Sequence, residues 1–321
     1  MKKVLITGVT GFIGSHLALA LSKKGYEVYS IIKHSTSRDM KSLSPFLKDT
    51  IILTCDISDY QSVSHTIKNV DPDIVVHLAA LSPVRDSFER PFGYVQTNIV
   101  GTMNIAHSML ELADFKKKKL IYASTAEVYG IQKVQPTKED AALNPSSPYA
   151  ITKAMTDMYL RMMPSIYGLN TTVMRCTNTF GRKLDASFFV EYVITNILKR
   201  EKVYIGAPDS IRDYMYIDDH VNAYIKAIEH PEVSGEAFNA APGIGLTNKE
   251  VAFKIAEMLG YDKKKIVLGK YPPNYPIRPL ESDQPFIVLD NTKIKKMLGW
   301  KPEIKFEEGL KKTIDYWKYK M

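Results

Sequence analysis

Short apolar runs alternate with stretches of helical periodicity over the first half of the chain. The runs predict strands, and they are Lys3–Thr7, Glu27–Ile32, Ile51–Ile57, Ile74–Ala80 and Leu120–Ser124. The fourth run is almost entirely apolar, as expected for a parallel strand covered on both faces. Strands that alternate with helices predict an α/β fold, a doubly wound parallel sheet of the Rossmann type.

The pattern changes after Gly181, where the elements become shorter and more varied. At roughly 100–200 residues per domain, a chain of 321 residues has room for two domains. We expect a first domain over residues 1–182, rejoined by residues 213–242, and a smaller C-terminal domain formed mainly by residues 183–321.

Composition excludes several classes of protein. With 45% hydrophobic residues the chain is globular, and with only Cys55 and Cys176 it has neither a disulfide framework nor a Cys-rich metal site. The apolar runs are far shorter than the roughly 20 residues of a membrane helix, and the N-terminal run breaks at Gly8, so we expect a cytoplasmic protein without a signal peptide. The net charge is 43 − 35 = +8, which leaves nucleic acid, a membrane surface or a phosphorylated small molecule as acidic partners.

Three glycines follow the first strand at a spacing of three residues. Gly8, Gly11 and Gly14 lead into a helical pattern through Phe12 and Ile13. Glycines in a strand–turn–helix unit let backbone N–H groups and the positive end of the helix approach a pyrophosphate. We therefore expect a dinucleotide cofactor here.

The second and third strand ends suggest which dinucleotide is bound. The second strand is followed by Lys33, His34, Ser35 and Arg38, and no acidic residue stands where a free ribose 2′-hydroxyl would be held. The basic and hydroxyl groups suit a 2′-phosphate, which favours NADP while leaving NAD possible; a solvated basic loop is the alternative. Asp56, near the end of the third strand, is placed to accept from the adenine amino group.

Candidate chemistry gathers after the fifth strand. The segment Ser124–Gly130 (STAEVYG) follows that strand at its carboxyl end, where open parallel sheets place their active sites. Tyr149 and Lys153 follow on a helix at positions i and i+4 and so share one face. The lysine ammonium can lower the pKa of the phenol.

Together these motifs resemble the extended short-chain dehydrogenase/reductase family, which acts on nucleotide-activated sugars. The resemblance implies that Tyr149 is the acid/base at the sugar 4-hydroxyl, that Lys153 holds the nicotinamide ribose, and that Thr125 shares the substrate hydrogen bond, with Ser124 as a less favoured substitute. The implied cofactor contacts are Gly8, Gly11, Phe12, Ile13, Gly14, Lys33, His34, Ser35, Arg38, Asp56, Ile57, Leu78, Ala79, Ala80, Tyr149 and Lys153.

Glu127 distinguishes subgroups of that family. Its 4,6-dehydratases and nucleotide-glucuronate decarboxylases carry Glu at this position, and a carboxylate is useful because oxidation at C4 makes the C5 proton acidic. The sequence is similar to the Thr-Ser-Glu of GDP-mannose 4,6-dehydratases, although Ala126 replaces the Ser. The loop with Ser82 and Arg85 is also similar. The alternative is that Glu127 only caps the next turn.

The remaining substrate contacts come from the resemblance as well. Arg212 and Arg278 match family arginines that grip the diphosphate, for which the guanidinium fork is suited. The implied substrate-binding residues are Ser82, Arg85, Ser124, Thr125, Asn178, Phe189, Val190, Arg212 and Arg278. The C-terminal domain is thus expected to bind the nucleotide sugar.

The sequence therefore predicts an NADP-dependent nucleotide-sugar 4,6-dehydratase with a GDP-mannose-like substrate. A 4-epimerase or a 4-keto-sugar reductase is the alternative, and a decarboxylase would need a further arginine that we cannot place. A non-catalytic NADP-sensing or RNA-binding protein is disfavoured because Tyr149 and Lys153 are both present. We expect no metal, no nucleic acid and no membrane partner. Similar proteins form homodimers through helices near Asn98–Met109 and Tyr149–Met162, so a homodimer is expected.

Overall fold

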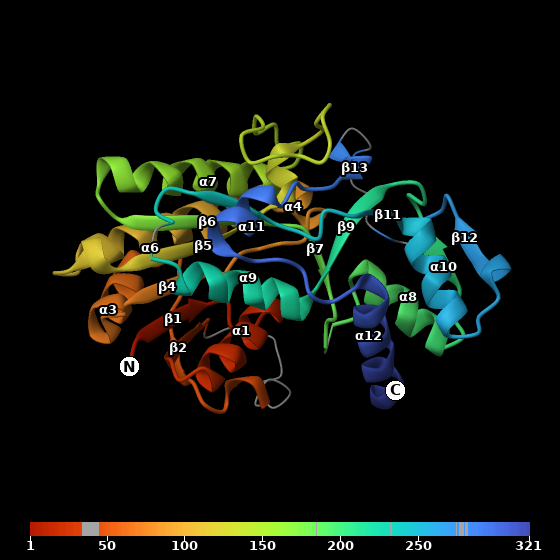
Figure 1. Cartoon of the computed structure of the whole chain (residues 1–321), viewed down its shortest axis with the longest axis horizontal. Helices are drawn as coiled ribbons and strands as arrows, with labels where there is room; N and C mark the ends of the chain where they lie inside the picture. The colour runs from red at the N-terminus through yellow and green to blue at the C-terminus, as the bar shows by residue number, and fades with distance from the viewer. Residues whose placement is uncertain (34–44, 184, 232, 274, 276–278, 280–281) are drawn as a thin grey trace.

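A computed structural model of the chain describes residues 1–33, 45–183, 185–231, 233–273, 275, 279 and 282–321 (Figure 1). Four of the predicted site residues, His34, Ser35, Arg38 and Arg278, lie outside the described residues.

The centre of the molecule is a seven-stranded sheet in the order β3-β2-β1-β4-β5-β6-β10, in which every neighbouring pair is parallel. The predicted doubly wound α/β fold is confirmed. The strands are β1 (Lys3–Thr7), β2 (Glu27–Ile32), β3 (Ile51–Thr54), β4 (Ile74–His77), β5 (Lys119–Thr125), β6 (Asn170–Cys176) and β10 (Ala237–Ala240).

Two strands end earlier than the apolar runs predicted. β4 stops at His77 rather than Ala80, because His77 pairs with Thr7, the last residue of β1. β3 stops at Thr54 rather than Ile57, because Thr54 pairs with Ile32, the last residue of β2. Beyond these points β2 offers β3 no further partner and β1 offers β4 none, although β5, on the other side of β4, continues to Thr125. The residues after β3 and β4 lie at the carboxyl edge of the sheet.

Helices cover both faces of this sheet (Figure 1). Leu17 and Leu21 of α1 share one buried cluster with Val221 and Ile225 of α9. The opposite cluster includes Ile67 of α3. The helices are α1 (Phe12–Lys23) and α9 (Ile217–Glu229) on the first face, and α3 (Tyr60–Val70), α6 (Gly101–Leu110) and α7 (Pro148–Ile166) on the second.

A π-helical turn, Val95–Val100, joins α5 (Pro91–Tyr94) to α6, and α4 (Asp86–Glu89) precedes them. Asn98 in this turn is 1% exposed and its amide donates to the Leu81 carbonyl (3.1 Å) and to Thr152 Oγ1 (3.0 Å), while its oxygen accepts from Leu81 N (2.9 Å). The π turn thereby ties the loop after β4 to α7, which carries Tyr149 and Lys153.

The C-terminal part is built around two small sheets, seen on the right of Figure 1. β9 pairs with β11, β13 and β7, and β8 pairs with β12. The chain leaves the first sheet after β6 and returns to it with α9 and β10. A domain boundary at residue 182 stays a prediction. The elements are β7 (Asn178–Phe180), α8 (Phe189–Leu198), β8 (Val203–Ile205), β9 (Ile211–Tyr216), β11 (Gly245–Thr247), α10 (Asn248–Met258), β12 (Ile266–Leu268), β13 (Phe286–Ile287) and α12 (Phe306–Lys320). Helix α11 (Thr292–Leu298) packs against β10 of the first sheet.

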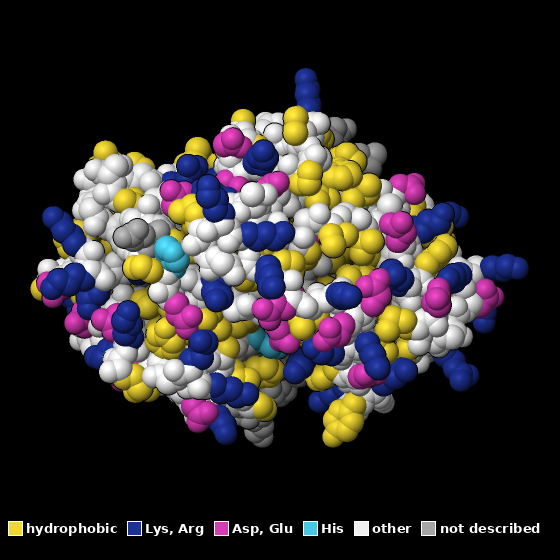
Figure 2. Space-filling view, in the orientation of Figure 1, with side chains coloured by type: hydrophobic (Ala, Val, Ile, Leu, Met, Phe, Trp, Pro, Cys, Tyr) yellow, Lys and Arg dark blue, Asp and Glu magenta, His cyan; other side chains and the backbone are white. Residues whose placement is uncertain are grey.

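Charge on the face drawn in Figure 2 is mixed. Basic and acidic side chains are interspersed there, and the basic ones do not gather into one continuous patch. Among the described residues of the molecule, several lysines are paired with carboxylates, such as Lys24 with Glu229 at 2.8 Å and Lys254 with Glu307 at 2.6 Å. On this face the net charge of +8 does not produce the basic stripe that is typical of nucleic-acid binding.

Candidate active site

The turn between β1 and α1 contains three glycines, and at Gly8 and Gly14 the neighbouring backbone leaves no room for a side chain. Gly8 has φ +76°, and a Cβ there would lie 2.7 Å from the Ala79 backbone nitrogen. A Cβ on Gly14 would lie 2.4 Å from the Gly8 carbonyl oxygen. Gly11 precedes α1 and offers no side chain to cap it. The turn therefore presents backbone N–H groups at a helix N-terminus, which fits a dinucleotide pyrophosphate.

His77 fixes the strand ends that flank this turn. Its Nδ1 lies 2.7 Å from Thr7 Oγ1 and its Nε2 lies 3.0 Å from Thr102 Oγ1, and Ala79 N donates to Thr7 Oγ1 (3.1 Å). Burial, assisted by the positive charge of Lys153, lowers the pKa of His77 to about 3. His77 is therefore neutral and has a structural part in this geometry.

Two residues that are predicted to bind the adenosine part of the cofactor, Lys33 and Asp56, are in contact with each other. Lys33 Nζ lies 2.9 Å from Asp56 Oδ2, and Ser58 donates to Asp56 Oδ1 through both its N–H (3.0 Å) and its hydroxyl (2.7 Å). Although burial acts in the other direction, these hydrogen bonds lower the pKa of Asp56. Ile57 is buried against Gly101 of α6, and Leu78, Ala79 and Ala80 are partly exposed after β4.

Thr125 and Tyr149 meet at the carboxyl end of β5. Ser147 caps α7 by accepting from Ala150 N (3.1 Å), and Pro148 occupies the first helical position, so that the Tyr149 ring is held in the first turn. The Tyr149 hydroxyl is hydrogen-bonded to Thr125, and the ring is 8% exposed. Burial raises the pKa of Tyr149, with the Thr125 hydrogen bond opposing it.

Lys153 is buried one turn after Tyr149, with its Nζ 4.3 Å from the centre of the Tyr122 ring. Burial lowers the pKa of Lys153 to about 7, against the opposing influence of Cys176 and Asp157. We expected the lysine to lower the pKa of Tyr149. In this structure burial dominates instead and the pKa of Tyr149 rises.

Ser124 points into a buried ionic network. Its hydroxyl donates to Asp157 Oδ2 (2.8 Å), and the same carboxylate accepts from Arg175 Nε and Nη2, both at 2.8 Å. Arg175 Nη1 also donates to the Tyr129 hydroxyl (2.9 Å). The Ser124 hydroxyl is thus engaged away from Tyr149, and it is Thr125 that faces the phenol. Arg175 and Asp157 are not among the predicted site residues, although a charged residue within a buried apolar strand signals a partner.

Glu127 lies in the 3₁₀ turn Ala126–Tyr129 and is held by a residue distant in sequence. Thr125 caps this turn by accepting from Glu127 N (3.3 Å), so the carboxylate is not the cap. Gln284 Nε2 donates to Glu127 Oε2 (2.9 Å). The negative charge of Glu127 also acts on Tyr149, whose pKa it helps to raise after burial. Sequence reasoning missed Gln284, because a single polar residue before a strand carries no periodic signal.

Arg212 of β9 lies within the electrostatic influence of Glu127. It is 9% exposed and donates through Nη2 to Asp283 Oδ1 (3.1 Å) and through Nη1 to the Ile211 carbonyl (2.9 Å). Burial lowers the pKa of Arg212, and the charge of Glu127 opposes that shift. Arg212 and Glu127 are therefore electrostatically coupled.

The other predicted substrate contacts are more dispersed. Arg85 stacks its guanidinium 4.0 Å from the centre of the Tyr275 ring. Ser82 and Asn178 are exposed. Phe189 is the first residue of α8, and Val190 after it is buried. The structure thus brings together Thr125, Glu127, Tyr149, Lys153 and Arg212.

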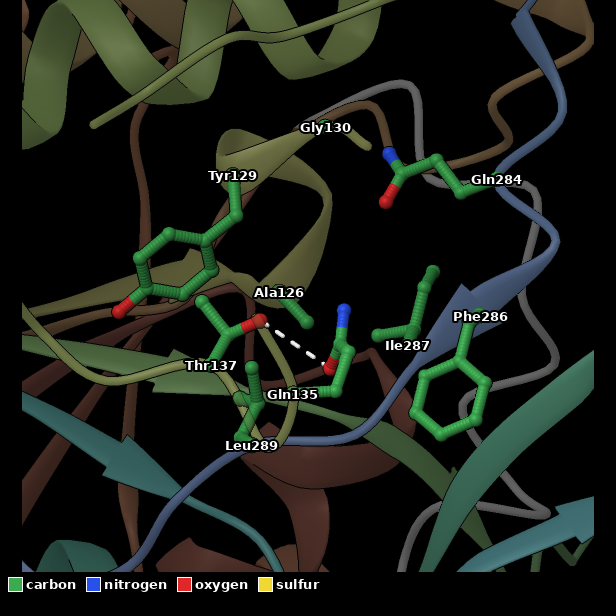
Figure 3. Close-up of a pocket in the computed structure, with 9 residues that line it drawn as sticks. All are labelled: Ala126, Tyr129, Gly130, Gln135, Thr137, Gln284, Phe286, Ile287 and Leu289. Atoms are coloured by element: carbon green, nitrogen blue, oxygen red, sulfur yellow. Dashed lines mark hydrogen bonds between the residues drawn. The ribbon is translucent and has the colours of Figure 1, made fainter. Parts of the chain in front are cut away.

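In the described part of the chain, no three His, Cys, Asp or Glu side chains are grouped so that they could hold a metal ion. Among the helices within the described ranges, none has the length and apolar character needed to cross a bilayer. A small hollow lies beside the turn that carries Glu127, and Figure 3 shows Ala126 and Gly130 on one side of it and Gln284 and Phe286 on the other.

Known families and proteins match this chain over nearly its whole length. The family model described as GDP-mannose 4,6 dehydratase matches residues 5–313. A dTDP-glucose 4,6-dehydratase of Salmonella typhimurium is 31% identical and the match covers 98% of this chain and 92% of that protein. A UDP-glucose 4-epimerase of Mycolicibacterium smegmatis is 29% identical, with 99% of each chain covered.

Similar solved structures also include both an epimerase and a dehydratase. The UDP-glucose 4-epimerase of Thermotoga maritima with UDP-glucose superimposes with a TM-score of 0.87 at 33% identity and covers 99% of both chains. The dTDP-glucose 4,6-dehydratase DesIV of Streptomyces venezuelae, with NAD bound, gives a TM-score of 0.87 at 26% identity and covers 99% of this chain and 97% of its own.

Proposed function

The chain belongs to the GDP-mannose 4,6-dehydratase family of the extended short-chain dehydrogenase/reductases, and from that premise we propose that it is a nucleotide-sugar 4,6-dehydratase. The observation that carries the proposal is the carboxylate of Glu127, held on the turn capped by Thr125 and acting electrostatically on Tyr149. A 4-epimerase needs only the hydroxyl groups of Thr125 and Tyr149 at the sugar 4-hydroxyl. A dehydratase also needs a base that removes the C5 proton.

The residues of this chain divide the reaction between them. A nicotinamide dinucleotide, for which the glycine turn is shaped, supplies reversible hydride acceptance when bound. Tyr149, hydrogen-bonded to Thr125, takes the proton of the sugar 4-hydroxyl as C4 is oxidised to a ketone. Lys153 lies one turn after Tyr149, and in its protonated form it would oppose the rise that burial causes in the pKa of Tyr149.

Elimination then depends on Glu127. With C4 a ketone, Glu127 takes the C5 proton and the electron pair of the broken C–H bond enters the C4–C5 enolate. As this pair forms the C5–C6 double bond, the C6–O bond breaks, and the departing hydroxide takes the proton that Glu127 removed from C5 and leaves as water. A bound nicotinamide dinucleotide would supply the hydride that C6 then needs, and with a proton added at C5 the product is a 4-keto-6-deoxy sugar.

For the cofactor and substrate we propose NADP and a GDP-mannose-like nucleotide sugar. Lys33 follows β2 where an NAD site would carry an acidic residue, which supports a 2′-phosphate. The substrate proposal rests on the family model and on Glu127. Arg212, and Arg278 outside the described residues, are proposed to bind the diphosphate, with Asn178, Phe189 and Val190 nearby in the C-terminal part.

The test is to incubate the pure protein with GDP-mannose, CDP-glucose, dTDP-glucose, UDP-glucose and UDP-N-acetylglucosamine and to determine the mass of each product. We expect the loss of one water from one of them, and NADP in the material released when the protein is denatured. Glu127→Gln should lower the rate of water loss by roughly 100-fold or more, while C4 oxidation continues. An unchanged mass with an inverted C4 would establish the 4-epimerase instead, and NADPH consumption on a 4-keto sugar would establish a reductase.

A further inference from the structure

Gln284 is a buried amide whose donors are both directed to one residue. Its side chain is 0% exposed and lies two residues before β13. Nε2 donates to Glu127 Oε2 at 2.9 Å and lies 3.4 Å from the Glu127 carbonyl oxygen. Among the described atoms Oε1 has no hydrogen-bond partner. Figure 3 shows the side chain extending from the β13 side toward the turn that carries Glu127.

This arrangement is not what packing alone would select. An apolar side chain would fill the same space without leaving a buried carbonyl oxygen unpaired, which is unfavourable. A carboxylate can only accept hydrogen bonds, so the contact with Glu127 requires the NH₂ end of the amide and determines which way the amide is turned. Among the described residues, the hydrogen bonds that a glutamine makes here are those to Glu127.

The residue before Gln284 holds the neighbouring cation. Asp283 accepts from Arg212 Nη2 at 3.1 Å, and Arg212 is electrostatically coupled to Glu127. Residues 283 and 284 therefore hold both the proposed base and an arginine proposed to bind the diphosphate. The hydrogen bond to Oε2 leaves Oε1 of Glu127 as the oxygen not held by Gln284.

We propose that Gln284 is a positioning residue that fixes the Glu127 carboxylate for removal of the C5 proton. The inference rests on the proposed dehydratase function. It assigns to Gln284 no contact with the reacting atoms: its contribution is to hold one carboxylate oxygen so that the other faces the substrate in a single orientation. Misplacement of a reacting group by about 1 Å can cost 100-fold in rate, so the effect should be measurable.

The test compares two steps in single-turnover reactions. Gln284→Met removes both donors at similar volume. We expect water loss to slow by about 10- to 100-fold while the first reduction of the cofactor changes by less than about threefold, so that reduced cofactor accumulates and is seen by its absorbance. Gln132→Met is the matched control, because Gln132 Nε2 donates to the Tyr129 and Ala142 carbonyls of the same region and does not touch Glu127.

A double variant separates positioning from general support of the fold. If Gln284 acts through Glu127, adding Gln284→Met to Glu127→Gln should slow water loss no further. A further loss in the double variant, equal slowing of both steps in Gln284→Met, or parent-like kinetics would each overturn the proposal. A parent enzyme that releases no water from any nucleotide sugar overturns the dehydratase function first, and this result is seen before any Gln284 variant is made.

Gln284→Glu provides a second route if the methionine variant does not fold. It keeps the shape and places a second carboxylate beside Glu127, in the field of Arg212 and Tyr149. Two close carboxylates raise the apparent pKa of the pair, so the acid limb of the pH–rate profile should move to higher pH. An acid limb that stays in place contradicts the contact between residues 284 and 127.

Discussion

Lys153 shows how burial and chemistry compete at one residue. Its ammonium is 4.3 Å from the centre of the Tyr122 ring, and its pKa is lowered to about 7 by burial. At neutral pH the side chain is therefore close to its midpoint, so it can gain or lose a proton at little cost. The lowered pKa that makes this proton exchange possible also lowers the free energy of unfolding, because a charged lysine is unfavourable in this position.

Lys153→Met should reveal that cost. Between about pH 7 and pH 10.4 an unfolded lysine binds more protons than the folded one, so the free energy of unfolding of the parent rises with pH in that window. Methionine has no such dependence. The variant should be more stable than the parent by about 1–3 kcal/mol at pH 6, and the difference should shrink by pH 9.5. Urea unfolding at the two pH values measures it; a gap independent of pH contradicts the prediction.

At the scale of elements, the local signals were predictable and the contacts between distant segments were not. Apolar runs identified the first five strands, and the i, i+4 spacing placed Tyr149 and Lys153 on one helix. Where β3 ends follows from where β2, its neighbour in the sheet, ends, and no local pattern records this. The role of Ser124 in a buried network and the contact of Gln284 with Glu127 join residues that are 33 and 157 positions apart.

The ion pair that joins β6 to α7 is the element-scale contact with the largest expected effect. Arg175 and Asp157 are both fully buried and share two hydrogen bonds of 2.8 Å. Arg175→Met leaves the carboxylate buried without its cation and should lower the free energy of unfolding by about 3–5 kcal/mol. Adding Asp157→Leu should recover part of that loss. Urea unfolding tests both variants, and a single variant within 1 kcal/mol of the parent would contradict the expected role.

At the scale of the whole molecule, one side of α7 is apolar and exposed. Ile151, Met155, Met158 and Ile166 are 53%, 42%, 55% and 66% exposed. Their spacing of four, three and eight residues places them along one stripe of the helix, as in helices that pack against a partner. The stripe lies on the helix that carries Tyr149, so an interface there would also support the active site.

We therefore predict a homodimer through α7, with a mass about twice the 36.3 kDa of one chain. Met155→Glu combined with Met158→Glu would place like charges opposite each other across a two-fold interface and should dissociate it. The matched control is Tyr319→Glu, because Tyr319 is 92% exposed near the C-terminus and off this stripe. Analytical ultracentrifugation at micromolar concentration distinguishes the outcomes: the parent and Tyr319→Glu should sediment as dimers and the double variant as a monomer. A monomeric parent, or a double variant that stays dimeric, places any interface elsewhere.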